Sequence, residues 1–453
     1  MKIRSLILVL MMALLVMVMP AAAQDEEATD VVVWVAFTDG RLDWARERAA
    51  EFNELYPEYN VIVEGYGSYN EAFDATLLAA EQSNPPAITH FFEAATQEAR
   101  DAVTASGDPL FKSVEAAIDG RTEINGVPVV LGDVVSAAAN YYTTDGEFTS
   151  MPWNTSSAIM FTNADLLAAA GIEEIPATWQ EIEAACEIIM AMDDAPESCA
   201  TWPNHSWFFE QSMGQQGADL ANNGNGRESR ATEVYINSDA AVAYMNWWKG
   251  MYDNGYYVYT GVVRDWTGTY NAFIAQQVAF LIYSSSDTTL ITNDSDAAGF
   301  SAVASFMPYN GDVEYVGNLI GGATLWLNTC LDESTGTGAL MFLALFVNPE
   351  NAASLHQFAG YIPVTTTAVG LLQEEGWYDE NPNSLVASAQ LAAAQETTAT
   401  AGALVGNFVA IRDVITDAVE EILLNDVDVV EALTDANEEA NTLLSDYNEL
   451  YSE

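Results

Sequence analysis

Val31-Val32-Val33-Trp34-Val35-Ala36-Phe37 is an apolar, β-branched stretch with the length of one strand. It ends at Thr38-Asp39-Gly40, and the periodicity after it predicts an amphipathic helix over residues 42–56. A second strand (61–65), a second helix (70–82) and a third strand (87–92) follow, with Pro85-Pro86 ending the helix. Apolar strands that alternate with helices predict a parallel sheet covered on both faces.

The same alternation starts again after residue 157. We expect strands at 158–162, 278–283, 302–307 and 325–327, and helices at 164–170, 179–192, 240–254, 269–276, 409–424 and 428–447. Ser284-Ser285-Ser286 is a plausible helix start, and the Ala/Thr-rich stretch 392–403 is expected to be a loop or a frayed helix. The predicted architecture is therefore two α/β lobes with helical decoration. Ligands of such folds bind at the carboxyl ends of strands, often in the cleft between lobes.

The N-terminus has the pattern of a secretory signal peptide, predicted over residues 1–23. Lys2 and Arg4 precede an apolar run at 6–19, and Pro20-Ala21-Ala22-Ala23 provides small residues for cleavage. The run is short for a membrane span, which leaves a permanent anchor as the weaker alternative. We expect a protein secreted across the cytoplasmic membrane, either periplasmic or extracellular.

Acidic residues dominate the composition: 66 Asp and Glu stand against 13 Lys and Arg, giving a formal net charge of −53. Nucleic-acid binding requires a basic surface, so a nucleic-acid partner is excluded. The acids are scattered along the chain, which indicates a solvated acidic surface. Because cations are scarce, each one is informative, and Arg412 is the only cation that follows Arg264.

Cysteine and histidine usage argues against metal and nucleophilic chemistry. Cys186 and Cys199 either form a short disulfide loop or stay reduced and buried. His90, His205 and His356 are far apart in sequence, and no metal-binding or hydrolase motif accompanies them. We expect no metal, no cofactor and no enzymatic activity, with a secreted hydrolase as the distant alternative.

Several segments resemble one family over nearly the whole chain. They are Gly67-Ser68-Tyr69, Phe92-Glu93, the segment Pro152-Trp153-Asn154-Thr155-Ser156-Ser157, residues 318–326, 348–353 and 356–365, Gly406-Asn407 and Ile411-Arg412. The chain is similar to the extracellular solute-binding proteins of ABC importers, and above all to those that bind glycerol-3-phosphate or glycerophosphodiesters.

The resemblance implies a monomeric protein with a two-lobed periplasmic-binding-protein-like fold of type II. Lobe one would comprise residues 25–153 and 325–380, and lobe two residues 154–324 and 381–453. The protein would capture a small polar ligand such as glycerol-3-phosphate or glycerophosphocholine by lobe closure, and deliver it to an ABC permease.

The resemblance also implies ligand contacts at individual positions. Tyr69 would contact the glycerol end, and the Glu93 carboxylate would accept hydrogen bonds from hydroxyl groups. Ser156 and Ser284 would contact ligand as hydroxyl donors. The Gly322 amide would approach the phosphate, which a Cβ atom would hinder.

Three further types of contact complete the expected site. Tyr361 would bind phosphate, and Arg412 would hold it bidentately; the alternative for Arg412 is a surface ion pair with Asp413 or Glu420. Trp202 and Trp207 would pack against the glycerol carbons, although their spacing is longer than the family's. Ala403-Leu404 replaces a second basic residue that the family often has. A receptor for a neutral sugar or oligosaccharide is therefore the main alternative.

Overall fold

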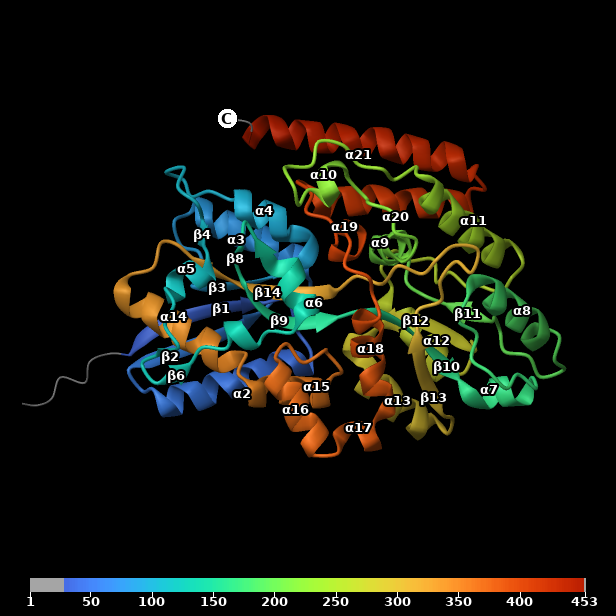
Figure 1. Ribbon diagram of the computed structural model, residues 1–453, viewed down its shortest axis with the longest axis horizontal. Coiled ribbons are helices and arrows are strands. Elements are labelled where there is room, and N and C mark those ends of the chain that lie inside the picture. Colours follow the sequence, from blue (N-terminus) through green and yellow to red (C-terminus); the bar gives the residue numbers. More distant parts are fainter. Residues whose placement is uncertain (1–27, 452–453) are drawn as a thin grey trace, which may run out of the picture.

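The computed structural model describes residues 28–451, so the predicted signal peptide lies outside the described residues. Two β-sheets organise these residues, one in each half of the molecule (Figure 1). The first sheet has six strands in the order β2-β1-β3-β14-β4, with β9 paired to β14. Their bounds are β1 (Thr29–Val35), β2 (Tyr59–Gly65), β3 (Ile88–Phe92), β4 (Phe111–Lys112), β9 (Met151–Ser156) and β14 (Gly321–Asn328).

The expectation of a parallel sheet is correct only for the first three strands. β1 pairs with β2 and β3 in parallel, whereas β14 is antiparallel to β3, β4 and β9. The reason is the route of the chain, since β14 arrives from the second sheet rather than through a helical crossover of the first. Mixed sheets arise in this way when a strand enters from another part of the fold.

The second sheet has the order β11-β12-β10-β13. Strand β10 is antiparallel to both neighbours, and β11 is parallel to β12. The bounds are β10 (Ala158–Asn163), β11 (Ala200–Thr201), β12 (Phe280–Ser284) and β13 (Ala302–Phe306). Two short hairpins, β5 (Glu123–Ile124) with β6 (Val127–Pro128) and β7 (Thr143–Thr144) with β8 (Glu147–Phe148), lie outside both sheets.

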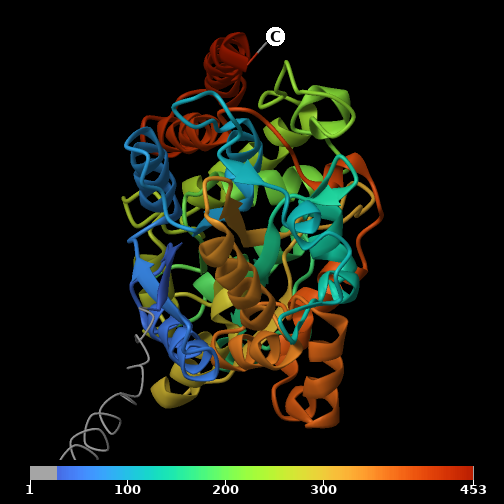
Figure 2. The same ribbon diagram turned by 90° about the vertical axis from the view of Figure 1, so that its left-hand side faces the viewer.

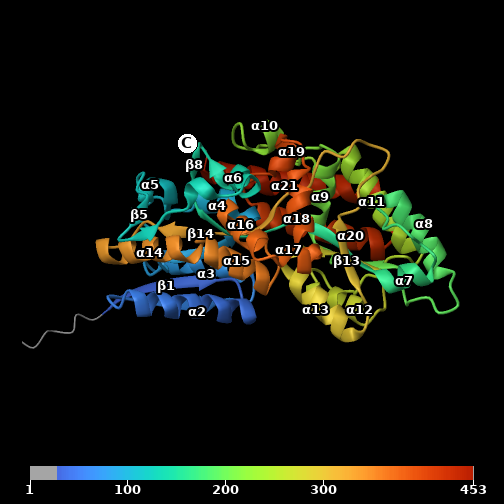
Figure 3. The same cartoon turned by 60° about the horizontal axis from the view of Figure 1, so that its bottom comes forward.

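Helices surround the first sheet, and those that follow β1 and β2 each begin at a side-chain cap and bury one apolar face. Asp39 caps α2 by accepting from the Arg41 N–H, and Ser68 caps α3 by accepting from the Glu71 N–H. Figure 3 shows α2 running alongside β1. The bounds are α2 (Gly40–Leu55), α3 (Tyr69–Glu81), α4 (Thr96–Asp101), α5 (Val114–Ile118), α6 (Ser136–Tyr142), α14 (Glu333–Phe346), α15 (Pro349–Phe358), α16 (Thr366–Glu374) and α17 (Trp377–Glu380).

The remaining helices surround the second sheet and extend over the first. They are α7 (Ala164–Ala169), α8 (Trp179–Met190), α9 (Ser206–Gln215), α10 (Asn222–Asn225), α11 (Asp239–Asp253), α12 (Trp266–Ile274), α13 (Thr288–Ala298), α18 (Val386–Ala392), α19 (Thr398–Ala401), α20 (Phe408–Leu424) and α21 (Val429–Tyr451). Helix α21 forms one edge of the molecule (Figure 2). The stretch 392–403 contains the end of α18 and the single turn α19. Within residues 28–451, no helix combines the length and apolar composition of a membrane span.

Two strands carry the chain between the sheets. β9 belongs to the first sheet and is followed at once by β10 of the second, and β14 returns from β13 to the first sheet. The lobe boundaries expected at 153/154 and 324/325 fall inside these two strands, each of which pairs wholly within the first sheet. The residue ranges of the lobes stay a prediction.

A disulfide joins Cys186 of α8 to Cys199, which precedes β11. Both residues are fully buried in the core of the second half of the molecule, where α8, α9 and α11 pack. Of the two alternatives that the sequence left open for this pair, the structure therefore has the bonded one. Cys330 is exposed and takes no part in it.

Candidate ligand-binding cleft

A cavity of about 770 Å³ lies between the two sheets. Its walls come from the carboxyl ends of β1, β3 and β12, from β9 and β14, and from the starts of α3, α9, α12 and α20. Eight of the nine residues expected to bind ligand line it: Tyr69, Glu93, Ser156, Trp207, Ser284, Gly322, Tyr361 and Arg412. Residues from distant parts of the chain thus meet at the cleft that the sequence predicted.

Trp202 is the exception, and its expected place in the cleft is wrong. Its side chain is 1% exposed and stacks on Trp247, with ring centroids 5.3 Å apart; the tilted ring of Tyr257 lies 4.3 Å away. It leaves β11 directly into the aromatic core between the sheet and α11. Trp207 lies five residues further on, at the start of α9, and lines the cavity. The longer spacing between the two tryptophans explains why only Trp207 reaches the cavity.

Arg412 is bound by two carboxylates at the wall of the cavity. Its Nε and Nη2 donate to Glu210 Oε1 and Oε2, each at 2.7 Å, and Nη2 also donates to Glu93 Oε1 at 2.7 Å. The side chain of Arg412 is 3% exposed, and both carboxylates are 8% exposed. Nη1 makes none of these bonds. This arrangement differs from both expectations, because the guanidinium is neither free for phosphate nor paired with Asp413 or Glu420.

Burial and neighbouring charges shift the pKa values of Glu93 and Arg412. Burial raises the pKa of Glu93, and the adjacent Arg412 guanidinium acts against that rise. Burial alone would lower the pKa of Arg412, but Glu210 and Glu93 raise it overall. Of the two carboxylates, only Glu93 lines the cavity, where it can accept hydrogen bonds from hydroxyl groups.

Arg41 is a cation of the cavity that the sequence reasoning missed. Its Nη1 donates to Asp287 Oδ1 at 3.4 Å and to the Tyr361 hydroxyl at 3.3 Å. Nε and Nη2 are held by Asp39, with Nη2 2.5 Å from Oδ2. The signal that could have revealed Arg41 is its position just after the carboxyl end of β1, where α/β folds bind ligands.

Every arginine of the cavity faces a carboxylate. Arg264, the third one, forms an ion pair with Asp413. Glu210, the second carboxylate on Arg412, was also missed, since one acid among so many carries no signal of its own. Its only distinguishing feature is the apolar sequence around it, Trp207-Phe208-Phe209. The local environment is therefore charge-compensated rather than positive.

Two backbone features support the polar side chains. Ser284 accepts from the Ser286 N–H and so begins the 3-10 turn η3 (Ser285–Asp287), which leaves its own hydroxyl proton for other partners. Gly322 has φ +102°, and a Cβ atom there would lie 1.8 Å from the carbonyl oxygen of Asn154 on the paired strand β9. Close strand pairing thus requires glycine at position 322, independently of any ligand.

A chain of hydrogen bonds links Tyr69 to the interior. The Tyr69 hydroxyl and Asn154 Nδ2 are 3.0 Å apart, and Asn154 Oδ1 lies 2.8 Å from His90 Nε2. The N–H of Ala36 lies 3.2 Å from His90 Nδ1. Burial lowers the pKa of His90 to about 3, with the Asn154 hydrogen bond opposing this, so the ring is neutral at ordinary pH. Tyr69 is therefore held in place by an uncharged network.

Aromatic rings cover much of the remaining wall. Tyr69 stacks on Phe92, with ring centroids 5.2 Å apart. On the opposite side, Trp266 packs edge-on against Tyr283 at 4.9 Å, and Tyr270 lies 6.2 Å from Tyr283. Such surfaces suit the C–H faces of polyols and sugars, and also quaternary ammonium groups.

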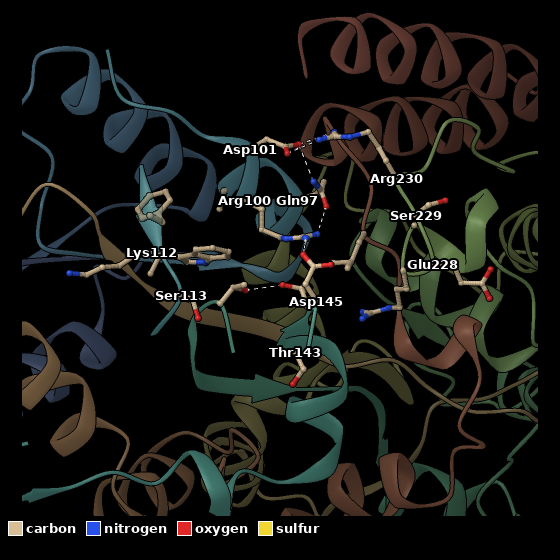
Figure 4. Close-up of a pocket in the computed structure, with 18 residues that line it drawn as sticks. Gln97, Arg100, Asp101, Lys112, Ser113, Thr143, Asp145, Glu228, Ser229 and Arg230 are labelled. Atoms are coloured by element: carbon tan, nitrogen blue, oxygen red, sulfur yellow. Dashed lines mark hydrogen bonds and ion pairs between the residues drawn. The ribbon is translucent and has the colours of Figure 1, made fainter. Parts of the chain in front are cut away.

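A second cavity, of about 450 Å³, contains a group of basic residues away from the cleft (Figure 4). Arg230 forms a bidentate pair with Asp101 at 2.7 and 2.9 Å, and Arg100 pairs with Asp145. Arg227 donates to backbone carbonyls, among them Gly402 O at 2.6 Å. These contacts join α4 and the β7–β8 hairpin to the loop after α10. These three arginines are committed to connecting parts of the chain.

The two-sheet architecture and the polar, aromatic cleft between the sheets define a two-lobed solute-binding protein with an α/β fold of type II. A family model described as bacterial extracellular solute-binding protein matches residues 47–386, and the chain belongs to that family. It is thus a solute-binding protein of the kind that serves ABC importers. Within the described residues, no group of three His, Cys, Asp or Glu side chains is arranged to hold a metal ion.

Individual relatives and solved structures agree with this assignment. The sn-glycerol-3-phosphate-binding periplasmic protein UgpB of Salmonella typhimurium is 29% identical over 406 residues, covering 87% of this chain and 88% of that protein. The structure of UgpB from Mycobacterium tuberculosis in complex with glycerophosphocholine has a TM-score of 0.76 at 20% identity, covering 93% of this chain and 99% of that one. Maltose-bound MalE3 of T. maritima has a TM-score of 0.73 at 17% identity, covering 92% and 100%.

Proposed function

We propose that this protein captures glycerol-3-phosphate or a glycerophosphodiester, such as glycerophosphocholine, by lobe closure and delivers it to the permease of an ABC importer. It would act outside the cytoplasmic membrane, in the periplasm or an equivalent compartment, as a monomeric binding protein without enzymatic activity. Relatives named for periplasmic sn-glycerol-3-phosphate binding support this proposal over most of the chain length.

The observation that carries the proposal is the pairing of a polyol wall with a hydroxyl-rich wall in one cavity. Glu93, which Arg412 holds in place, offers its carboxylate in the same cavity as Trp207, which suits a glycerol moiety. Donors for phosphate oxygens lie elsewhere in the cavity, at Ser156, Ser284 and Tyr361, with Arg41 adjacent. Arg412 would thus hold the acidic side chains in position for the glycerol end.

Closure would follow from contacts that only the closed cleft can make. Tyr69 and Glu93 extend from the first sheet, whereas Ser284 and Trp207 extend from the second half of the molecule. A ligand that touches both sets binds the closed form more tightly than the open form, and shifts the equilibrium by that difference.

A neutral sugar receptor is the second candidate, and one observation favours it. Each arginine that lines the cavity already faces a carboxylate, so the site has no uncompensated positive charge. Sugar hydroxyls would bind to the carboxylates, and a sugar ring would stack on Trp207.

Isothermal titration calorimetry of the secreted form against glycerol-3-phosphate, glycerophosphocholine and maltose separates the two candidates. Saturable binding of either phosphate compound, without binding of maltose, is the expected result. Binding of maltose alone would overturn the phosphate assignment and establish the sugar receptor. Hydrolysis of glycerophosphocholine by the purified protein would overturn the receptor role itself.

A further inference from the structure

Arg41 and Asp287 form a loose ion pair across the ligand cleft. Arg41 lies in the first turn of α2, beside the first sheet, and Asp287 ends the turn η3 that follows β12 of the second sheet. Only one contact joins them, at 3.4 Å, whereas the contacts of Arg412 with its carboxylates are 2.7 Å long. Both side chains line the cavity and are only partly exposed, at 22% and 15%.

Arg41 is placed to accept an anion in exchange for Asp287. Its Nη1 already shares the space between Asp287 and the Tyr361 hydroxyl, at 3.4 and 3.3 Å. Asp39 holds the other side of the guanidinium and fixes its direction, while Phe37 lies beneath it at 4.9 Å. A phosphate oxygen that takes the place of Asp287 would therefore meet two donors, Arg41 Nη1 and the Tyr361 hydroxyl, which are already in position.

Asp287 would lose Arg41 as its ion-pair partner in this exchange and would need another positive charge nearby. An unpaired, largely buried carboxylate is costly, because neither water nor a cation compensates it. The surroundings of Asp287 suit a bulky cation. The same cavity is lined by the aromatic rings of Tyr283, Trp266 and Tyr270. Burial, and to a smaller extent the negative charge of Asp287, raises the pKa of Tyr283 well above its ordinary value.

We propose that Arg41 and Asp287 select ligands in which a phosphodiester is joined to an ammonium group. The phosphodiester replaces Asp287 on Arg41, and the ammonium replaces Arg41 on Asp287, against the aromatic rings of Trp266 and Tyr283. A dianionic phosphate monoester supplies no cation and would leave Asp287 beside added negative charge. This inference rests on the proposed function and narrows its ligand class to zwitterionic glycerophosphodiesters.

The test compares two diesters with the same phosphate charge. Calorimetry would measure glycerophosphocholine, which carries an ammonium group, and glycerophosphoglycerol, which does not. The wild-type protein should bind glycerophosphocholine about tenfold or more tightly than glycerophosphoglycerol. Asp287→Asn should weaken glycerophosphocholine by about tenfold and leave glycerophosphoglycerol within about threefold. Arg41→Gln should weaken both diesters.

Asp145→Asn is the matched control, since it removes a carboxylate from an arginine of the second cavity and should change neither affinity. The wild-type comparison of the two diesters stands alone if Asp287→Asn does not fold. Equal weakening of both diesters by Asp287→Asn, or equal wild-type affinities, would overturn the exchange and leave the proposed function intact. Failure of the wild type to bind either diester or glycerol-3-phosphate would overturn both.

Discussion

Replacing Arg412 by Ala tests the group of charges at the centre of the cleft wall. The substitution removes the cation from between Glu93 and Glu210 and leaves two carboxylates in a site where both are 8% exposed. Removing one partner of a buried ion pair typically costs about 3–5 kcal/mol, because the remaining charge is uncompensated. We expect a loss of that size in the free energy of unfolding at neutral pH, measured by urea denaturation without ligand.

The pH dependence of this loss identifies its cause. Without Arg412, burial raises the pKa of Glu93 above its value in the unfolded chain with nothing to oppose it, so the folded variant binds more protons than the unfolded one. The stability of the variant, relative to wild type, should therefore fall as pH rises from the unfolded-state pKa of Glu93 through its raised folded-state pKa. The difference from wild type should be smaller at about pH 5 than at about pH 8.

Arg264→Ala provides the matched control, since the Arg264–Asp413 pair is 34% and 50% exposed. Exposed pairs contribute about 0–1 kcal/mol, so this variant should stay close to wild type. A loss below about 1 kcal/mol for Arg412→Ala would refute the buried ion-pair reasoning. A loss that is large but independent of pH would point to missing packing rather than unpaired charge.

Three further predictions concern stability in the absence of ligand. Cys186→Ser should cost about 3 kcal/mol, as expected for a cross-link between residues 13 apart in sequence, and reductant should then have no added effect on urea denaturation. Burial raises the pKa of Glu98 from 4.5 to about 7, so its contribution to stability falls as pH rises through that range. Glu98→Gln should remove this part of the pH profile of unfolding, and an unchanged profile would contradict it. Gly322→Ala should cost at least about 2 kcal/mol and lower the melting temperature, because its Cβ would meet the Asn154 carbonyl; a fully stable variant would contradict this.

The sequence was informative where one physical effect dominates locally. The apolar run at 31–37 corresponds to β1, and the periodic segment 409–424 corresponds to α20. Each predicted end lies within two residues of the end in the structure. Helix α14 was not predicted, because Gly336 and Gly338 weaken helix propensity within Glu333–Phe346. Tertiary packing requires the second of these glycines, since a Cβ atom at 338 would lie 2.5 Å from the ring of Tyr59.

For the cleft, too, the sequence predicted features that lie within one segment and missed contacts between distant segments. Residues carried by recognisable segments, such as Tyr69 and Tyr361, do line the cavity. Pairing partners could not be predicted, because any of 66 acidic residues could have faced Arg412. Only the folded chain shows that Glu210, far away in sequence, approaches from α9. Long-range pairing of charges is a property of the topology rather than of any sequence window.

The direction of the hydrogen bonds that lead to Tyr69 decides what its hydroxyl can offer. The Ala36 N–H can only donate, so His90 Nδ1 accepts and the ring proton resides on Nε2. His90 then donates to Asn154 Oδ1, and Asn154 Nδ2 donates to the oxygen of Tyr69. The phenolic proton of Tyr69 is left for the cavity, so any group that meets it there has to be an acceptor, such as an ether or phosphoryl oxygen. A backbone amide just after β1 thereby makes the Tyr69 hydroxyl a donor toward the cavity, without any ionised group in between.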